Sequence, residues 1–171
     1  RQGEEGVEMS PGRPLRIAVC GAGECDPAVY EQARHVGRLL GQAGVVLLCG
    51  GLGGVMEGAC RGAVEAGGTT VGILPGNDPA AANPHVELPI ATGIGQARNA
   101  VLVLSAQAVI AIAGEAGTLS EIALALKTGR PVVGLGTWRL TRANGSPEER
   151  IRYATTPEEA VRLALQSASS V

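Results

Sequence analysis

The sequence predicts an α/β fold: a single Rossmann-like doubly wound domain with a mainly parallel sheet. Short apolar runs that are typical of buried strands alternate with helical segments along the chain. Three of these runs are followed by glycine-rich turns, at residues 21–23, 50–54 and 114–117. In a doubly wound sheet such turns share the carboxyl edge, where ligands bind at the switch point. We therefore expect one ligand site built from all three turns.

The first half of the chain predicts repeated strand–turn–helix units. Residues 1–14 are rich in Gly, Glu and Pro, and we expect a disordered arm there, with the domain over residues 15–171. Each apolar run after the arm ends at a glycine turn or a loop. A helix is expected after the first and the second of these runs. Strands are expected at 15–20, 45–49 and 69–74, and helices at about 27–43 and 54–66.

The second half continues the alternation. The three prolines of residues 75–85 predict a loop, and a short strand is expected at 85–91. The run at 108–112 is wholly apolar, as in a buried strand. The segment Thr156-Pro157-Glu158-Glu159 is typical of a helix start, with proline in the first turn. Helices are expected at about 94–105, 118–128 and 156–166, strands at 108–112 and 131–135, and a polar loop at 138–150.

Composition argues against several classes of partner. The 171 residues are 45% hydrophobic and 18% charged, which fits one globular domain. The net charge of −2, with 2% aromatic residues and no Phe, argues against nucleic-acid binding. No apolar run reaches the roughly 18 residues of a membrane span, and no signal peptide is apparent. We expect a cytoplasmic protein without a nucleic-acid or membrane partner.

The cysteines and the single lysine argue against further classes of chemistry, namely metal binding and lysine-based catalysis. The four cysteines, Cys20, Cys25, Cys49 and Cys60, form no CxxC pair, so we expect reduced thiols and no metal site. Lys127 is the only lysine, and it lies two turns into a predicted helix. Lysine-based catalysis, including pyridoxal-phosphate chemistry, is therefore not expected.

The stretch at 113–133 is the strongest candidate for a binding site. Gly114 and Gly117 allow a tight turn after a buried strand, and Thr118 is expected to open a helix. Backbone N–H groups at such a turn, with the helix dipole behind them, form an anion site that most often takes phosphate. The alternative is an ordinary turn that needs glycine for positive φ. Glu115 either repels the anion or turns to solvent while its N–H faces the ligand.

Several side chains near these turns have two interpretations. Glu121 either faces the ligand or closes a capping box with Thr118. Arg98 either reaches the ligand or forms a surface ion pair, and Asn99 is a weaker candidate beside it. Glu57 either contacts the ligand or only favours the positive end of its helix, and Met56 is either a ligand contact or core. The pattern Gly21-x-Gly23 alone is weak, because Asp26 stands where a dinucleotide fingerprint has glycine.

Four segments together match a known family. They are CGGLGGVMEGA at 49–59, EAGGTTVGILP at 65–75, Ala97-Arg98-Asn99, and residues 114–121. These segments resemble the LOG-like superfamily, whose older name is "lysine decarboxylase-like". The resemblance covers about residues 15–136 and implies a Rossmann-like fold.

Two branches of that superfamily are relevant. The LONELY GUY enzymes are phosphoribohydrolases that cleave cytokinin riboside 5′-monophosphates, with the signature PGGxGTxxE preceded by an Arg-Lys pair. The molybdenum cofactor carrier proteins and uncharacterised bacterial relatives have an Ala-Arg-Asn version. Ala113 and Glu115 replace the Pro and second Gly of the enzyme signature here, and Asn99 replaces the Lys. The chain therefore resembles the carrier-like branch more closely.

The resemblance and the turns define the candidate site. We expect a small phosphorylated, nucleotide-like or pterin-like ligand, such as a nucleoside monophosphate or the molybdenum cofactor, and no required cofactor. The alternative is a phosphoribohydrolase in which Glu121 stabilises the sugar cation and Arg98 assists the leaving base. Apolar helices at 54–66 and 94–105 predict a homodimer or homotetramer, as the resemblance also implies. The candidate catalytic residues are Arg98 and Glu121, and the candidate ligand-binding residues are Gly21, Gly23, Gly51, Gly53, Gly54, Met56, Glu57, Asn99, Gly114, Glu115, Gly117 and Thr118.

Overall fold

The computed structural model describes residues 12–170, so the arm predicted for residues 1–14 lies almost entirely outside the described part of the chain. Within this range, seven strands form one wholly parallel sheet in the order β4-β3-β2-β1-β5-β6-β7. The predicted α/β Rossmann-like class is confirmed. The strands are β1 (Arg16–Gly21), β2 (Val46–Cys49), β3 (Thr70–Leu74), β4 (Leu88–Ala91), β5 (Ala108–Ile112), β6 (Val132–Leu135) and β7 (Ile151–Ala154).

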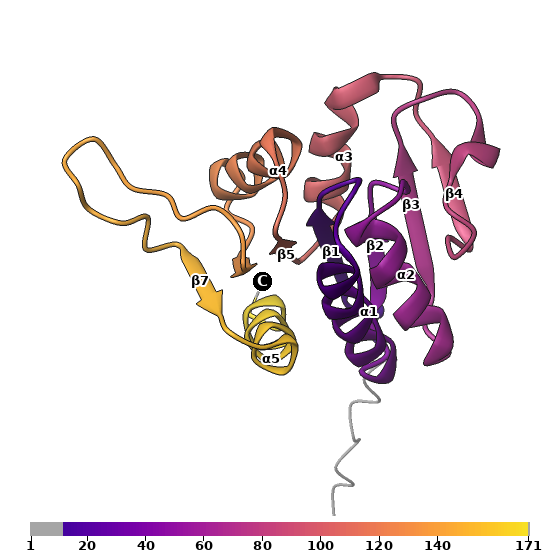
Figure 1. Ribbon diagram of the computed structural model, residues 1–171, viewed down its shortest axis with the longest axis horizontal. Coiled ribbons are helices and arrows are strands. Elements are labelled where there is room, and N and C mark those ends of the chain that lie inside the picture. Colours follow the sequence, from indigo (N-terminus) through magenta and orange to yellow (C-terminus); the bar gives the residue numbers. More distant parts are fainter. Residues whose placement is uncertain (1–11, 171) are drawn as a thin grey trace, which may run out of the picture.

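Helices cover both faces of the sheet (Figure 1). One core lies under α1, α2 and α5, and a second lies under α3 and α4. Strand β5 has all five residues buried, as its apolar run predicts for a central parallel strand. The helices are α1 (Pro27–Gln42), α2 (Val55–Glu65), α3 (Arg98–Ser105), α4 (Ala116–Lys127) and α5 (Pro157–Ala168), with 3-10 turns η1 (Pro79–Ala81) and η2 (Gly95–Ala97).

The switch point lies between β1 and β5. The chain builds outward from β1 through β2 and β3 to β4, and then returns to place β5 on the other side of β1. The loops that leave the carboxyl ends of β1 and β5 therefore run to opposite sides. This divergence leaves an opening between them at the edge of the sheet.

The structure differs from the predicted elements mainly near the C-terminus. Strand β7 was not predicted, because only Ile151 and Ala154 of its four residues are buried and no apolar run marks it. It forms the edge of the sheet beside β6. Helix α4 begins at Ala116 rather than at Thr118, and the helix predicted over 94–105 is split into η2 and α3.

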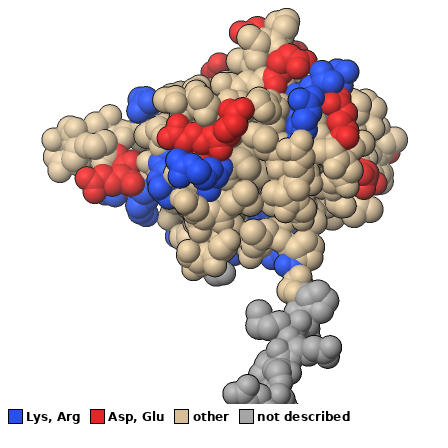
Figure 2. Space-filling model, turned by 90° about the horizontal axis from the view of Figure 1, so that it is seen from below, with Lys and Arg blue, Asp and Glu red and all other residues tan. Residues whose placement is uncertain are grey.

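Charged side chains of both signs lie next to one another on the face drawn in Figure 2. Ion pairs also join helices: Glu65 on α2 is paired with Arg34 at 2.8 Å and with Arg38 at 3.2 Å, both on α1. The guanidinium of Arg34, followed by that of Arg38, lowers the pKa of Glu65. Among residues 12–170, no helix is both long enough and apolar enough to cross a membrane.

Candidate functional site

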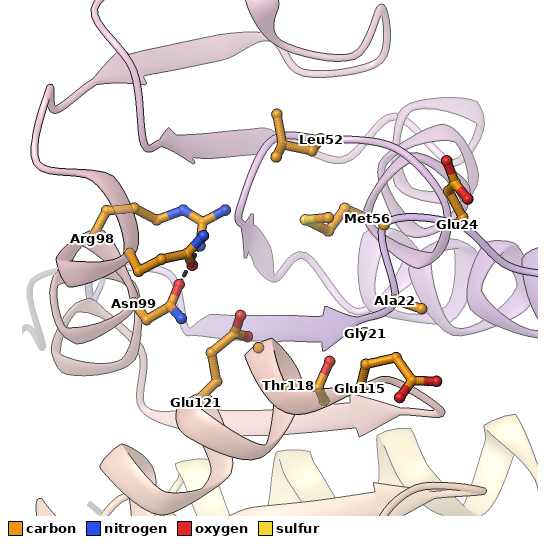
Figure 3. Close-up of a pocket in the computed structure, with 13 residues that line it drawn as sticks. Gly21, Ala22, Glu24, Leu52, Met56, Arg98, Asn99, Glu115, Thr118 and Glu121 are labelled. Carbon is orange, nitrogen blue, oxygen red and sulfur yellow. Dashed lines mark hydrogen bonds between the residues drawn. The ribbon is translucent and has the colours of Figure 1, made fainter.

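A cleft of about 460 Å³ opens at the carboxyl edge of the sheet, at the switch point. Its walls come from the turns after β1 and β2, the first turn of α2, the η2–α3 segment and the start of α4. Figure 3 shows how these side chains surround it. The lining residues are Gly21, Ala22, Gly23, Glu24, Leu52, Met56, Gln96, Arg98, Asn99, Glu115, Gly117, Thr118 and Glu121.

Most of the candidate residues predicted from the sequence lie around this cleft, although some do not. The five that do not line it are Gly51, Gly53, Gly54, Glu57 and Gly114. Four lining residues, Ala22, Glu24, Leu52 and Gln96, were not predicted. Each of the four lies within or beside a predicted turn or helix start, so the position of the turns was the only available signal for them.

Two of the glycines outside the cleft wall are required by turn geometry. Gly54 has φ +62°, and a Cβ there would lie 2.2 Å from the carbonyl oxygen of Ala22. Gly114 has φ +97°, and a Cβ there would overlap the side chain of Thr118. These residues shape the turns around the cleft without forming its surface.

The first turn of α4 opens directly onto the cleft. Glu115 is the N-cap residue, and its side chain makes no capping hydrogen bond. The first N–H groups of a helix have no acceptor within the helix, and both Gly117 and Thr118 line the cleft. Thr118 is the third residue of the helix and not its cap. The capping-box interpretation of Thr118 and Glu121 is therefore wrong, because the helix starts earlier than the sequence suggested.

Glu121 places a buried carboxyl group against the cleft. The residue is 7% exposed, and among residues 12–170 its Oε2 has no hydrogen-bond partner. Burial raises its pKa above the ordinary value, while a hydrogen bond with the Cys20 thiol and the charge of Arg98 act in the opposite direction. Buried polar atoms are normally paired. An unpaired oxygen at the wall of a cleft is thus well suited to accept an N–H or O–H group from a ligand.

Arg98 is a fixed positive charge in the wall of the cleft rather than a surface residue. It is 5% exposed, and its Nε donates to the Ile73 carbonyl at 2.9 Å. Its Nη1 donates to Asn99 Oδ1, and its Nη2 donates to the Gly50 carbonyl at 3.4 Å. These bonds hold the guanidinium in one orientation. The surface ion pair considered from the sequence does not form, since no carboxylate of the described residues pairs with it.

The charges are unevenly distributed along the cleft. Arg98 lies at one end, whereas the carboxylates of Glu24 and Glu115 lie at the other (Figure 3). Both glutamates are exposed, so water screens them more than it screens Arg98. The positive features facing the interior are therefore Arg98 and the start of α4.

None of the four cysteines lines the cleft. Cys20, at the end of β1, contacts Glu121, and burial raises the pKa of its thiol. The sulfur atoms of Cys49 and Cys60 are 3.4 Å apart. All four cysteines are free thiols, and within residues 12–170 no cluster of His, Cys, Asp or Glu is suited to a metal ion.

A parallel, doubly wound sheet with a cleft at its switch point defines a Rossmann-like α/β protein. More specifically, the chain belongs to the SLOG cluster4 family, whose model matches residues 14–161. An uncharacterized protein of Archaeoglobus fulgidus is 43% identical over 153 residues, which cover 90% of this chain and 96% of that protein.

Two similar solved structures are of proteins described as binding or carrying the molybdenum cofactor. The molybdenum cofactor binding protein of the phototrophic bacterium Rippkaea orientalis is 39% identical, with a TM-score of 0.82, over 90% of this chain and 97% of that chain. The Moco carrier protein of Chlamydomonas reinhardtii is 34% identical, with a TM-score of 0.79, over 93% of this chain and 100% of that chain. These matches confirm the predicted resemblance to the carrier-like branch. DNA processing protein A of Helicobacter pylori, at 19% identity, shares the fold alone.

Proposed function

We propose that this chain binds a small phosphorylated, pterin-like ligand in the cleft, as a molybdenum cofactor carrier-like protein. The observation that carries the proposal is the uncapped start of α4, which opens onto a cleft that also contains the fixed charge of Arg98. The similarity to proteins described as binding or carrying the molybdenum cofactor supports this choice of ligand class.

Each end of the ligand has a matching group in the cleft. A phosphate accepts hydrogen bonds from the N–H groups at Gly117 and Thr118, where the helix dipole also favours negative charge. The unpaired Oε2 of Glu121 accepts a hydrogen bond from an N–H or O–H group of the same ligand. Because Arg98 is held by its own hydrogen bonds, it contributes charge without having to reorganise.

Cofactor retention by matched variants tests this proposal. Wild-type protein is mixed anaerobically with molybdenum cofactor released from a denatured molybdoenzyme and passed through gel filtration, and the molybdenum that co-elutes is measured. Gly117→Glu and Gly117→Gln place side chains of nearly equal size at an open position, since a Cβ at Gly117 meets nothing within 4 Å. Both variants should fold, because Gly117 lies in the first turn of a helix.

We expect the wild type to retain the cofactor but not molybdate alone. Gly117→Glu should bind roughly tenfold more weakly than Gly117→Gln, because only the former places a negative charge beside the phosphate. No retention by the wild type would refute the proposal. Equal losses in the two variants would show that the ligand does not place an anion at α4.

Phosphoribohydrolase activity is the second candidate, and the placement of both Arg98 and Glu121 on the lining of one cleft favours it. The test is release of the base from AMP and from an N6-modified AMP, with Glu121→Ala as the control. Efficient turnover that disappears in the variant would establish the hydrolase. We expect little or no turnover, since Glu115 and Asn99 replace residues of the enzyme signature.

We also propose that the chain forms a homodimer or homotetramer. Exposed apolar side chains lie on β4 and α3 and between them, whereas α2 packs mainly against α1. Light scattering at micromolar concentration should show an assembly, and a clean monomer would refute this proposal. The exposed residues of this group are Leu88, Ile90, Ile94, Val101 and Leu104, and the other exposed large hydrophobic residues among those described are Val64 on α2 and Trp138.

A further inference from the structure

Two side chains that do not line the cleft hold the backbone turn that leads into α4. The segment that follows β6 contains Thr137 and Trp138. The hydroxyl of Thr137 donates to the carbonyl oxygen of Ala113 at 2.6 Å. The indole Nε1 of Trp138 donates to the carbonyl oxygen of Glu115 at 3.1 Å. The two hydrogen bonds therefore hold the turn at Ala113 and at Glu115.

This turn has a backbone that needs such support. Ala113 has φ +49° and Gly114 has φ +97°, so two successive residues lie in the left-handed region. A non-glycine residue there costs free energy that its surroundings must offset. Ala113 has one further tie, a hydrogen bond from its N–H to the Leu135 carbonyl at 3.2 Å.

The direction of the two carbonyl groups determines where the next N–H groups point. In a trans peptide the C=O and the following N–H point in opposite directions. A bond from Thr137 to the Ala113 carbonyl thus orients the N–H of Gly114, and the bond from Trp138 to the Glu115 carbonyl orients that of Ala116. The Glu115 carbonyl also accepts the first helical bond, from Leu119 at 3.0 Å, so Trp138 reinforces the start of the helix.

The segment that contains Thr137 and Trp138 is itself hydrogen-bonded to β7, the edge strand of the sheet. The hydroxyl of Tyr153, on β7, donates to the Trp138 carbonyl at 2.9 Å and accepts from the Leu140 N–H at 3.3 Å. The guanidinium of Arg139 lies 4.3 Å from the centre of the Tyr153 ring. The unpredicted strand β7 is therefore connected through Trp138 to the wall of the cleft.

We propose that Thr137 and Trp138 are positioning residues, which hold the turn at 113–117 so that the first N–H groups of α4 face the ligand. The proposal rests on the proposed function, because it assumes that these N–H groups bind the anion. Loss of either side-chain donor loosens the turn and weakens ligand binding. Neither residue touches the ligand.

The test compares Thr137→Val, which keeps the shape but loses the hydroxyl, with Thr137→Ser, which keeps the hydroxyl. Trp138→Phe is the second variant, and it loses only the indole donor and part of the ring. Hydrogen exchange of the Ala113 and Leu119 amides, which donate to the Leu135 and Glu115 carbonyls, is measured without ligand, together with retention of the released molybdenum cofactor. Melting temperatures are recorded for every variant.

In Thr137→Val and Trp138→Phe we expect exchange to be roughly fivefold faster, the change expected for one lost hydrogen bond. We expect a similar fivefold loss of cofactor affinity, with Thr137→Ser close to the wild type. Unchanged exchange in both variants would overturn the proposal, as would faster exchange with unchanged affinity. A wild type that retains no cofactor would instead refute the proposed function, and exchange alone would then decide whether the two residues hold the turn.

Discussion

Glycine-rich turns form both halves of the cleft, but most glycines of one half are closely packed, whereas Gly117 in the other half faces open space. In the half formed by the turns after β1 and β2, backbones are in direct contact: a Cβ at Gly54 would lie 2.2 Å from the Ala22 carbonyl oxygen, and the Val55 N–H donates to the same carbonyl at 3.0 Å. In the α4 half, a Cβ at Gly117 meets nothing within 4 Å, and side chains from another segment hold the turn.

Some glycines are therefore needed because neighbouring segments pack closely against them, whereas Gly117 leaves space that a ligand can occupy. The same contrast extends into the helices, because a Cβ at Gly62 of α2 would lie 1.8 Å from the Arg34 carbonyl of α1. The close contact of α1 and α2 makes the first half a rigid wall. The second half leaves backbone donors accessible, and it is the half to which we assign the phosphate.

The largest predicted difference is in the free energy of unfolding when one glycine of each half is replaced by alanine. Gly54→Ala places a Cβ 2.2 Å from the Ala22 carbonyl in a backbone conformation with φ +62°. We expect it to destabilise the fold by about 3 kcal/mol or more. Gly117→Ala should change stability by less than about 1 kcal/mol, in the stabilising direction, because alanine is the better helix former.

Urea denaturation of the two variants at a single pH measures this contrast. The wild type serves as the reference, and equal slopes of the transitions would show that only stability has changed. Similar destabilisation by both substitutions would break the comparison, since it would mean that the α4 turn is packed as closely as the other.

A second experiment asks which half carries the anion. Glu24 and Glu115 both line the cleft, one from each half. Glu115→Gln removes a negative charge next to the start of α4 and should raise cofactor affinity by about fivefold. Glu24→Gln is the matched control on the opposite wall, where we expect a smaller gain. The measurement is cofactor retention over a series of protein concentrations. A larger gain for Glu24→Gln would move the phosphate to the β1 turn.

The smallest expected effect is a pH dependence of stability that comes from the carboxyl group of Glu121, which lies between the two halves of the cleft. Glu121 lies on α4 beside Cys20 of β1, and burial raises the pKa of its carboxyl group above the ordinary value of 4.5. The folded state therefore binds more protons than the unfolded state between that value and the raised one. The unfolding free energy contributed by Glu121 is present below pH 4.5 and falls as pH rises through the raised pKa.

Glu121→Gln does not titrate, so the stability of the wild type relative to this variant should decrease as pH increases. Urea denaturation of both proteins at several pH values from 4 to 8 provides the measurement. Other carboxylates, such as Glu65, are present in both proteins and cancel in the difference. Parallel stability profiles would show that the carboxyl group of Glu121 titrates normally in the fold.

Much of the fold could be predicted from local sequence patterns. The apolar run at 108–112 predicted a buried strand, and β5 is buried along its whole length and has the predicted ends. The three glycine turns predicted the edge of the sheet at which the cleft lies. Strand β7 could not be predicted in this way, because Ile151 and Ala154 are its only buried residues and its pairing with β6 is a long-range contact.

The sequence by itself determined the class of the fold, the succession of strands and helices along the chain up to β6, and the edge of the sheet at which a site could form. These properties follow from hydrophobic periodicity and from backbone freedom at glycine, and both are local. Only the tertiary structure decided the rest: that Gly54 serves packing while Gly117 faces open space, that α4 starts before Thr118, and that Thr137 and Trp138 hold the turn. Those properties depend on contacts between segments far apart in the chain, and no local pattern records them.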